Sequence, residues 1–315
     1  MIKRVVITGA SGMIGSALVD LLISNNIEVI AVSRPNSPKM TNISKSPLVR
    51  IIECDINKIE SLPLLIKDRC DMFFNFAWQG VASSSRNDVF VQNGDVINSI
   101  NAIKVAKELG CYKFVGAGSQ AEYGIKNKKL GCNTEVDPVT AYGVAKFSAG
   151  KLGKIFADSI GMEFNWVRIL STYGPKDNDY TMVMGTLKKM LAKESCDFTN
   201  GQQTWDYIYS SDAATAIYAI AQKGINGKTY PIGTGKDRLL KDFIQDMNEC
   251  VYNKTGAKAQ LNFGVITTDK NAVTYLCADI AELSQDTDFY PRVSFKDGIN
   301  KTIDFLIGQS DIYRL

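Results

Sequence analysis

Short apolar runs alternate with longer segments of helical periodicity through the first half of the chain. The runs are typical of buried strands and fall at residues 3–8, 28–32, 49–53, 71–76, 112–117 and 163–168. The helical patterns fall at residues 13–24, 58–68, 90–109 and 141–160. Strands that alternate with helices predict a parallel sheet covered on both faces, so we expect a doubly wound α/β fold.

The alternation becomes less regular after about residue 175. There the pattern predicts helices at residues 180–193, 211–223, 239–252 and 295–308. It predicts short strands near residues 196–198, 205–209, 229–232 and 260–266. Before that point, the polar loops 34–48 and 124–140 are candidates for covering a substrate, because loops at the ligand end of such a sheet often do so.

Three glycines spaced three residues apart separate the first predicted strand from the first predicted helix. Gly9 permits a tight turn, Gly12 lets the backbone approach a pyrophosphate, and Gly15 lets the helix pack against the strand. The unpaired N–H groups of the first helical turn attract the anion, with help from the helix dipole. The spacing therefore predicts a dinucleotide-binding loop, for which the alternative is an ordinary glycine-rich turn.

Composition narrows the chemistry that this chain can perform. Its 315 residues carry a formal net charge of +3 and no long basic or membrane-length apolar run, so we expect no nucleic-acid partner and no membrane span. The chain begins directly with a strand pattern, which favours a cytoplasmic protein without a signal peptide.

The seven cysteines form no CxxC pair and predict free thiols rather than disulfides or a metal site. The absence of histidine excludes a His base and a His-ligated metal.

Two further motifs supply candidate acid–base groups. Tyr142 and Lys146 lie four residues apart in a predicted helix and therefore project from the same face. A nearby ammonium lowers the pKa of a tyrosine, which then exchanges a proton with a substrate oxygen. Ser119 ends a predicted strand at the edge where such sheets bind ligands, and its hydroxyl is placed to hydrogen-bond the reacting oxygen. The alternatives are a solvated lysine beside a half-buried tyrosine, and a serine that caps a turn.

Together these motifs resemble the extended short-chain dehydrogenase/reductase family, in its nucleotide-sugar epimerase, dehydratase and ketoreductase branch. Ser119, Tyr142 and Lys146 match the catalytic residues of that family. The implied reaction is hydride exchange between a nicotinamide and a sugar carbon. Tyr142 would handle the proton, Lys146 would hold the nicotinamide ribose, and Ser119 would orient the oxygen. The cofactor-binding residues implied by the resemblance are Gly9, Ser11, Gly12, Met13, Ile14, Gly15, Asp55, Ile56, Ala77, Tyr142, Lys146 and Thr172.

The resemblance covers nearly the whole chain and also implies its domain organisation. Residues 1–170 would form a Rossmann domain, which the chain re-enters at about 206–233. Residues 171–205 and 234–315 would form a smaller mixed α/β substrate-binding domain, with the substrate in the cleft between the two. Members of the family commonly form homodimers through the helices expected here at 90–109 and 141–160, as a four-helix bundle.

The end of the second strand bears on the choice of cofactor. Ser33 and Arg34 stand near the position where a carboxylate would bind the adenosine ribose 2′-hydroxyl of NAD. A guanidinium suits a 2′-phosphate instead, through paired hydrogen bonds and charge. We therefore expect Ser33 and Arg34 to bind NADP(H), with NAD as the alternative cofactor. The resemblance links NADP(H) to net reduction, and a tightly held NAD to epimerases and dehydratases.

The residues after Ser119 narrow the reaction further. Dehydratases of the family carry an Asp-Glu pair where this chain has Gln120 and Ala121. Glu122 comes one residue late, and in an extended segment it would face the other way. Reduction of the C4 keto group of a nucleotide-linked 4-keto-6-deoxyhexose, for a bacterial glycan, is therefore the first expectation. A nucleotide-sugar 4-epimerase is the alternative, and a non-catalytic NADP(H)-binding regulator is a remote one.

The nucleotide and the sugar stay open at this stage. The resemblance places Gln79, Ser119, Gln120, Tyr123, Ser171 and Trp205 at the nucleotide-sugar substrate. Ser171 and Thr172 stand where the family often has an asparagine, and Trp205 stands where an arginine usually binds the substrate pyrophosphate. Trp205 is as well suited to core packing as to stacking on a ligand. Candidates for meeting the phosphate charge instead are Lys176, Lys188, Lys189 and Arg238.

Overall fold

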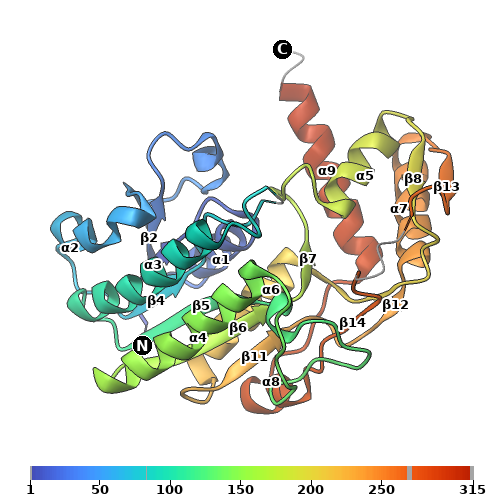
Figure 1. Cartoon of the computed structure of the whole chain (residues 1–315). Helices are drawn as coiled ribbons and strands as arrows, with labels where there is room; N and C mark the ends of the chain where they lie inside the picture. The colour runs from blue at the N-terminus through green and yellow to red at the C-terminus, as the bar shows by residue number, and fades with distance from the viewer. Residues whose placement is uncertain (1, 83, 268–271, 313–315) are drawn as a thin grey trace.

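A seven-stranded parallel sheet forms the centre of the protein in a computed structural model that describes residues 2–82, 84–267 and 272–312. The strands follow the order β11-β6-β5-β4-β1-β2-β3 (Figure 1). Their bounds are β1 Arg4–Thr8, β2 Glu28–Ser33, β3 Val49–Glu53, β4 Met72–Asn75, β5 Lys113–Ser119, β6 Glu163–Ile169 and β11 Thr229–Ile232. Because β1 pairs with both β2 and β4, the direction of winding reverses between β1 and β4. Doubly wound sheets bind ligands in the crevice at this point.

Helices cover both faces of this sheet. On one face α3 (Val89–Glu108) packs against α4 (Ala141–Ser159), and on the other α1 (Met13–Ser24) packs against α6 (Ser210–Lys223) (Figure 1). Under α3 and α4 the rings of Phe73, Phe114, Phe164 and Trp166 stack side by side across β4, β5 and β6, with centroids 5.6 to 6.1 Å apart. Strands buried on both faces need apolar residues at successive positions, which explains the continuous apolar runs in the sequence.

The C-terminal half builds a second group of elements beside the sheet, on the right in Figure 1. The helices α5 (Met182–Leu191), α7 (Leu240–Thr255) and α9 (Phe295–Ile312) pack around their own apolar core. The remaining elements are β7 Ser171–Tyr173, β8 Cys196–Phe198, β9 Thr204–Trp205, β10 Tyr207–Tyr209, β12 Arg238–Leu239, β13 Leu261–Phe263, β14 Tyr275–Leu276 and α8 Ala281–Thr287. β11 returns to the edge of the large sheet, beside β6. The exact division into two domains stays a prediction.

The doubly wound α/β fold expected from the sequence is confirmed, but one predicted helix is wrong. Residues 58–68 form a 3₁₀ turn at Ile56–Ser61 followed by the short helix α2 (Leu62–Leu65). The Asp55 carboxylate accepts a hydrogen bond from the N–H of Asn57 and starts the turn there. The backbone of Lys58 then leaves helical geometry. The pattern missed β7, β12, β14 and α8, whose short sequences carry too few residues to show a period.

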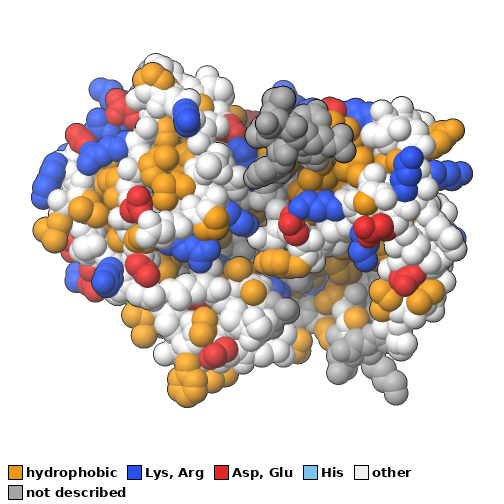
Figure 2. Space-filling view, turned by 90° about the horizontal axis from the view of Figure 1, so that it is seen from above, with side chains coloured by type: hydrophobic (Ala, Val, Ile, Leu, Met, Phe, Trp, Pro, Cys, Tyr) orange, Lys and Arg blue, Asp and Glu red, His pale blue; other side chains and the backbone are white. Residues whose placement is uncertain are grey.

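The surface shows mixed charge. In the described part of the face drawn in Figure 2, basic side chains lie scattered among acidic ones rather than gathered in one stripe. All seven cysteines lie within the described residues and are free thiols. Among the helices that the structure describes, none combines the length and the apolar character needed to cross a membrane.

Candidate active site

The glycine loop between β1 and α1 holds the backbone in a shape that suits a phosphate group. Gly9 has a φ of +68°, and a Cβ there would lie 2.8 Å from the backbone N of Ala77. A Cβ on Gly15 would lie 2.3 Å from the carbonyl oxygen of Gly9, so helix and loop touch directly. Gly12 caps α1 without a side-chain hydrogen bond to the first helical turn. The first N–H groups of α1, at Met13 and Ile14, therefore remain as donors for an anion, which fits a dinucleotide pyrophosphate.

A cavity of about 540 Å³ opens beside this loop, at the carboxyl ends of β1, β2 and β4. Its wall includes most of the residues that the sequence assigned to the cofactor. These are Gly9, Ser11, Gly12, Ser33, Arg34, Asp55, Ile56 and Ala77. Gln79, expected at the substrate, also lines this cavity and donates a hydrogen bond from Nε2 to Asn57 at 2.8 Å. The cavity is large enough for a cofactor-sized ligand.

The rim of the cavity at β2 is polar and basic. Ser33 ends β2, and its hydroxyl lies 3.4 Å from that of Ser11. Arg34 follows as an exposed side chain on the cavity wall, with no hydrogen bond or ion pair to the described residues. Lys39 lines the same wall and donates a hydrogen bond to Asn178, which joins the loop after β2 to the segment before α5. The sequence reasoning missed Lys39, because its loop follows no regular period.

Helix α3 fixes the segment that follows β4. The buried carboxylate of Asp95 accepts hydrogen bonds from the backbone N–H groups of Gln79 and Gly80, each at 2.9 Å. Buried Gln92 accepts a hydrogen bond from the indole of Trp78 at 3.0 Å and donates one to the carbonyl of Gly80 at 2.7 Å. A Cβ on Gly80 would overlap the Gln92 amide, so a larger residue there would displace the Gln92 side chain. These contacts hold Trp78 at the cavity wall.

The structure brings Ser119, Tyr142 and Lys146 together beside that wall. All three are buried, with exposed fractions of 7%, 9% and 4%. Tyr142 and Lys146 lie on the first two turns of α4, which Thr140 begins by accepting a hydrogen bond from Gly143. The Lys146 Nζ donates to the carbonyl of Ala117 at 2.7 Å. The predicted catalytic group is therefore assembled at the end of β5.

The pKa shifts of Tyr142 and Lys146 differ from the shift expected from the sequence. Burial raises the pKa of the Tyr142 phenol, and a hydrogen bond with Ser119 and the Arg86 guanidinium act against that rise. The predicted lowering of the Tyr142 pKa is not met: the pKa is raised, the cation that opposes the rise is Arg86, and the Lys146 Nζ donates to Ala117 instead. Burial instead lowers the pKa of Lys146 itself to about 7, against the charge of Glu122. Arg86, which the sequence reasoning missed, lies 4.2 Å from the Tyr142 ring centroid.

The other predicted substrate residues lie after β5 and around β7 and β9, where Tyr123 and Trp205 contact one apolar cluster. Gln120 begins a 3₁₀ turn at Gln120–Tyr123, so the extended segment assumed for residues after Ser119 is wrong. Tyr123 is fully buried and donates its hydroxyl hydrogen to the carbonyl of Gly131 at 2.9 Å. Trp205 donates a hydrogen bond to the Ser171 hydroxyl at 2.6 Å.

The neighbouring Thr172 has a buried hydroxyl oxygen without a hydrogen-bond partner among the described residues. A buried hydroxyl in this state is available to a ligand.

Of the basic side chains considered for the phosphate charge, three have acidic partners. Lys176 pairs with Asp20 at 3.6 Å, Lys188 with Asp179 at 2.6 Å, and Arg238 with Asp246 at 2.8 Å. Arg238 also lies opposite Trp205 in the pairing of β12 with β9. Strand pairing thus places Arg238 beside Trp205.

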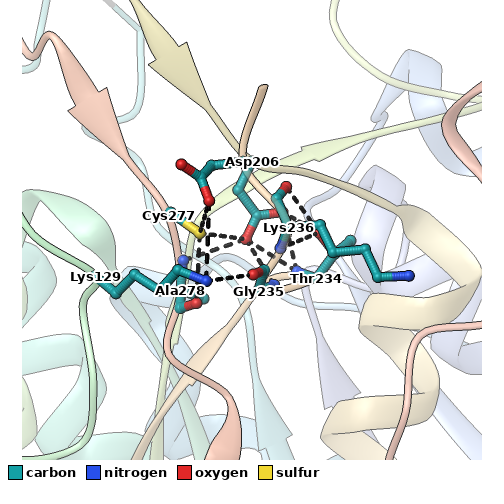
Figure 3. Close-up of polar contacts among 8 residues, drawn as sticks. Lys129, Asp206, Thr234, Gly235, Lys236, Cys277 and Ala278 are labelled. Atoms are coloured by element: carbon teal, nitrogen blue, oxygen red, sulfur yellow. Dashed lines mark hydrogen bonds and ion pairs between the residues drawn. The ribbon is translucent and has the colours of Figure 1, made fainter. Parts of the chain in front are cut away.

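Asp206, the residue after Trp205, anchors this corner of the molecule (Figure 3). Its fully buried carboxylate accepts hydrogen bonds from the N–H groups of Thr234 and Gly235 at 3.0 Å and from that of Ala278 at 3.2 Å. Burial raises the pKa of Asp206, and the hydrogen bonds from Thr234 oppose the rise. Through these hydrogen bonds the Asp206 carboxylate holds the segments after β11 and β14 against the start of β10. Trp205, the preceding residue, is held beside these segments.

A comparison with known protein families assigns this chain to one of them. A model of the NAD-dependent epimerase/dehydratase family matches residues 5–233. The chain belongs to this family. The match includes the glycine loop, the cavity wall at β2 and β4, and the Ser119, Tyr142 and Lys146 group.

Relatives within the NAD-dependent epimerase/dehydratase family match the chain almost from end to end. The "uncharacterized UDP-glucose epimerase YtcB" of Bacillus subtilis is 29% identical over 96% of this chain and 98% of its own. The CDP-abequose synthase of Salmonella typhimurium is 23% identical over 96% of this chain and 97% of its own. The structure of a UDP-glucose 4-epimerase from Thermotoga maritima with UDP-glucose is 23% identical, covers 98% of this chain and 99% of its own, and superposes with a TM-score of 0.84. The chain is thus an enzyme of the nucleotide-sugar epimerase/dehydratase type.

Proposed function

We propose that this enzyme reduces the C4 keto group of a nucleotide-linked 4-keto-6-deoxyhexose with NADPH. The observation that carries the proposal is the basic rim of the cavity, where Arg34 has no acidic partner among the described residues and Lys39 lies on the same wall. No carboxylate stands at the end of β2 to accept the 2′-hydroxyl of NAD. An unpaired guanidinium supports a 2′-phosphate ligand there.

The catalytic roles follow from the buried group at the end of β5. The bound nicotinamide supplies the hydride. Tyr142 delivers a proton to the oxygen at C4, since its phenol is hydrogen-bonded to Ser119 and burial keeps it protonated near neutral pH. Ser119 donates a hydrogen bond to the same oxygen as negative charge develops on it. Lys146 is held at Ala117 beside this group, and burial lowers its pKa to about 7.

Reduction is preferred to dehydration because the site lacks a free carboxylate beside Ser119. Gln120 and Ala121 cannot remove or deliver the proton that elimination of water requires. Glu122 does carry a carboxylate, but three donors engage it in the interior. Elimination across C5 and C6 therefore finds no free carboxylate in the described segment that follows Ser119.

A nucleotide-sugar 4-epimerase with tightly bound NAD is the second candidate. The relatives favour it, because the Bacillus and Thermotoga proteins are named as UDP-glucose epimerases. The same three residues serve both reactions, so the distinction depends on whether the oxidised cofactor leaves after each turnover. The CDP-abequose synthase among the relatives supports a CDP-linked deoxysugar as one substrate to test.

An NADPH-oxidation assay tests the proposal. The substrates are 4-keto-6-deoxyhexoses linked to CDP, dTDP, GDP or UDP, with NADH run in parallel. We expect oxidation of NADPH in step with substrate for one nucleotide, and loss of that activity with retained cofactor binding in Tyr142→Phe. Purified protein that holds NAD firmly and oxidises neither cofactor would instead support the epimerase. Activity that survives intact in Tyr142→Phe would contradict the assigned roles.

We also infer that two chains associate through α3 and α4. Apolar side chains stand exposed on these helices, with exposed fractions from 47% at Leu152 to 87% at Phe90. Ile97 and Ile155 add to the same surface. Pairing of two such surfaces would bury them in a four-helix bundle. Light scattering of the purified protein should give the mass of a dimer, and Ile155→Asp should shift it to that of a monomer.

A further inference from the structure

Glu122 is a fully buried acid directly behind the catalytic group. One of its oxygens accepts hydrogen bonds from the backbone N–H of Ser119 at 2.8 Å and from the indole of Trp166 at 2.9 Å. The other oxygen accepts from Nε of Arg168 at 2.7 Å, in an ion pair that leaves only 6% of Arg168 exposed. The Arg168 guanidinium in turn lies 4.6 Å from the ring centroid of Tyr123.

The backbone of β5 is shaped to admit these side chains. A Cβ on Gly118 would lie 2.3 Å from both the Glu122 carboxylate and the Trp166 indole nitrogen. A Cβ on Gly116 would lie 2.4 Å from the Trp166 ring. Gly118 thus leaves space for the Glu122 carboxylate, and both glycines leave space for the Trp166 indole. A buried ion pair gives little stability over well-packed apolar residues, so this arrangement calls for a role other than stability.

The contacts define the orientation of Ser119. Its hydroxyl oxygen accepts a hydrogen bond from the N–H of Ala121 at 3.1 Å. In return, the Glu122 carboxylate accepts a hydrogen bond from the N–H of Ser119, and the two bonds form a capping box. Both the backbone and the oxygen of Ser119 are therefore fixed. The hydroxyl hydrogen cannot point to Ala121, which is itself a donor, and is left for Tyr142 or a substrate oxygen.

We propose that Glu122 and Arg168 form a positioning pair that holds the Ser119 hydroxyl as a hydrogen-bond donor to the reacting oxygen. The catalytic consequence rests on the proposed function, whereas the placement of Ser119 does not. Arg168 pairs with the Glu122 carboxylate and holds it where it accepts the Ser119 N–H. Neither side chain of the pair contacts the substrate in this account.

The same two strands offer a matched control at their other ends. Lys113 at the start of β5 is 2% exposed and pairs with Glu163 at the start of β6 at 3.5 Å. This pair also joins β5 to β6, but it lies away from the catalytic residues. Lys113→Met should therefore alter stability without changing the turnover of the folded enzyme.

The test combines Glu122→Gln with the substitution Ser119→Ala. Glu122→Gln should lower kcat about 10- to 100-fold, as expected for a misplaced catalytic group, and leave NADPH binding within about twofold. In the Ser119→Ala background the same substitution should lower kcat less than about threefold, because the residue through which it acts is gone. Equal losses in both backgrounds, or an unchanged kcat in Glu122→Gln, would overturn the proposal. Glu122→Gln/Arg168→Gln removes both charges and serves as the second variant if the single one does not fold.

A readout without turnover separates this proposal from the proposed function. The amide resonance of Ser119, assigned by its loss in Ser119→Ala, should lie far downfield in the unmodified protein because a carboxylate accepts its hydrogen bond. It should move upfield in Glu122→Gln and stay in place in Lys113→Met. If the unmodified enzyme turns over no nucleotide sugar, the proposed function fails, while this resonance still decides the placement. An unmoved resonance in Glu122→Gln would overturn the positioning pair.

Discussion

The side-chain nitrogen of Lys146 lies 3.7 Å from the ring centroid of Trp78. Lys146 comes from α4 and Trp78 from the segment after β4, so the contact joins the catalytic helix to the cavity wall. The Trp78 ring also meets that of Tyr142 edge to face, with centroids 6.2 Å apart. A cation over an indole face is favoured electrostatically. Trp78 therefore connects the cofactor cavity to both Tyr142 and Lys146.

Trp78 should report cofactor binding. Of the three tryptophans, Trp78 alone lines the cavity, whereas Trp166 lies in the core and Trp205 beside Ser171. We expect NADPH to quench the intrinsic fluorescence of the enzyme because the ligand enters beside Trp78. The quench should disappear in Trp78→Phe, which keeps an aromatic ring but removes the indole. A quench of undiminished size in that variant would place the cofactor elsewhere.

Lys146 should make stability depend on pH in the cofactor-free protein. Burial lowers the pKa of Lys146 to about 7. An unfolded lysine has a pKa of about 10.4, so between these values the unfolded chain binds more protons than the folded one. The free energy of unfolding should therefore rise with pH from about 7 to about 10. Urea unfolding at several pH values in this range measures how steeply the free energy of unfolding rises with pH. The rise should be smaller in Lys146→Met, and an equal rise in both proteins would contradict the buried position of Lys146.

Arg34 should set the preference between NADPH and NADH. Arg34→Ala should weaken NADPH binding about 10- to 100-fold, since hydrogen bonds to a charged group contribute about 1.5–3 kcal/mol, and leave NADH binding unchanged. Arg50→Ala is the control, because Arg50 is an exposed arginine of β3 that pairs with Asp68 outside the cavity. Titration calorimetry with both cofactors gives the two dissociation constants. A parallel loss for NADPH and NADH would contradict a 2′-phosphate contact.

Alanine substitutions at two glycines should change the stability of the protein in opposite directions. Gly118→Ala places a methyl group against Glu122 and Trp166, so it should destabilise the fold by about 1–3 kcal/mol or more. Gly94 lies within α3, and a Cβ there meets no atom of the described residues within 4 Å. Gly94→Ala should therefore stabilise the protein by about 0.5–1 kcal/mol. Denaturant unfolding measures the stability of both variants, through the shift of the midpoint when the dependence on denaturant concentration is unchanged. Equal stability changes in the two variants would contradict the crowding at Gly118.

Much of the fold follows from local pattern. The strands at residues 49–53 and 229–232 and the helix at 13–24 have the bounds expected from the apolar pattern. The helix expected at 58–68 failed because Asp55 caps a 3₁₀ turn, a local hydrogen bond that competes with the helix. The strands β7 and β14 could not be predicted, since their partners β10 and β9 are distant in the sequence.

By itself the sequence determined the glycine loop proposed to bind phosphate and the serine, tyrosine and lysine proposed as the catalytic group. Glycine spacing and helical spacing are local properties that a chain carries before it folds. Only the tertiary structure decided what surrounds them: Trp78 against Lys146, Arg86 over Tyr142, and Glu122 behind Ser119. These contacts join segments that are distant in the chain or depend on a turn that the pattern did not show. The direction of each pKa shift was decided there too, because burial depends on what packs around a residue.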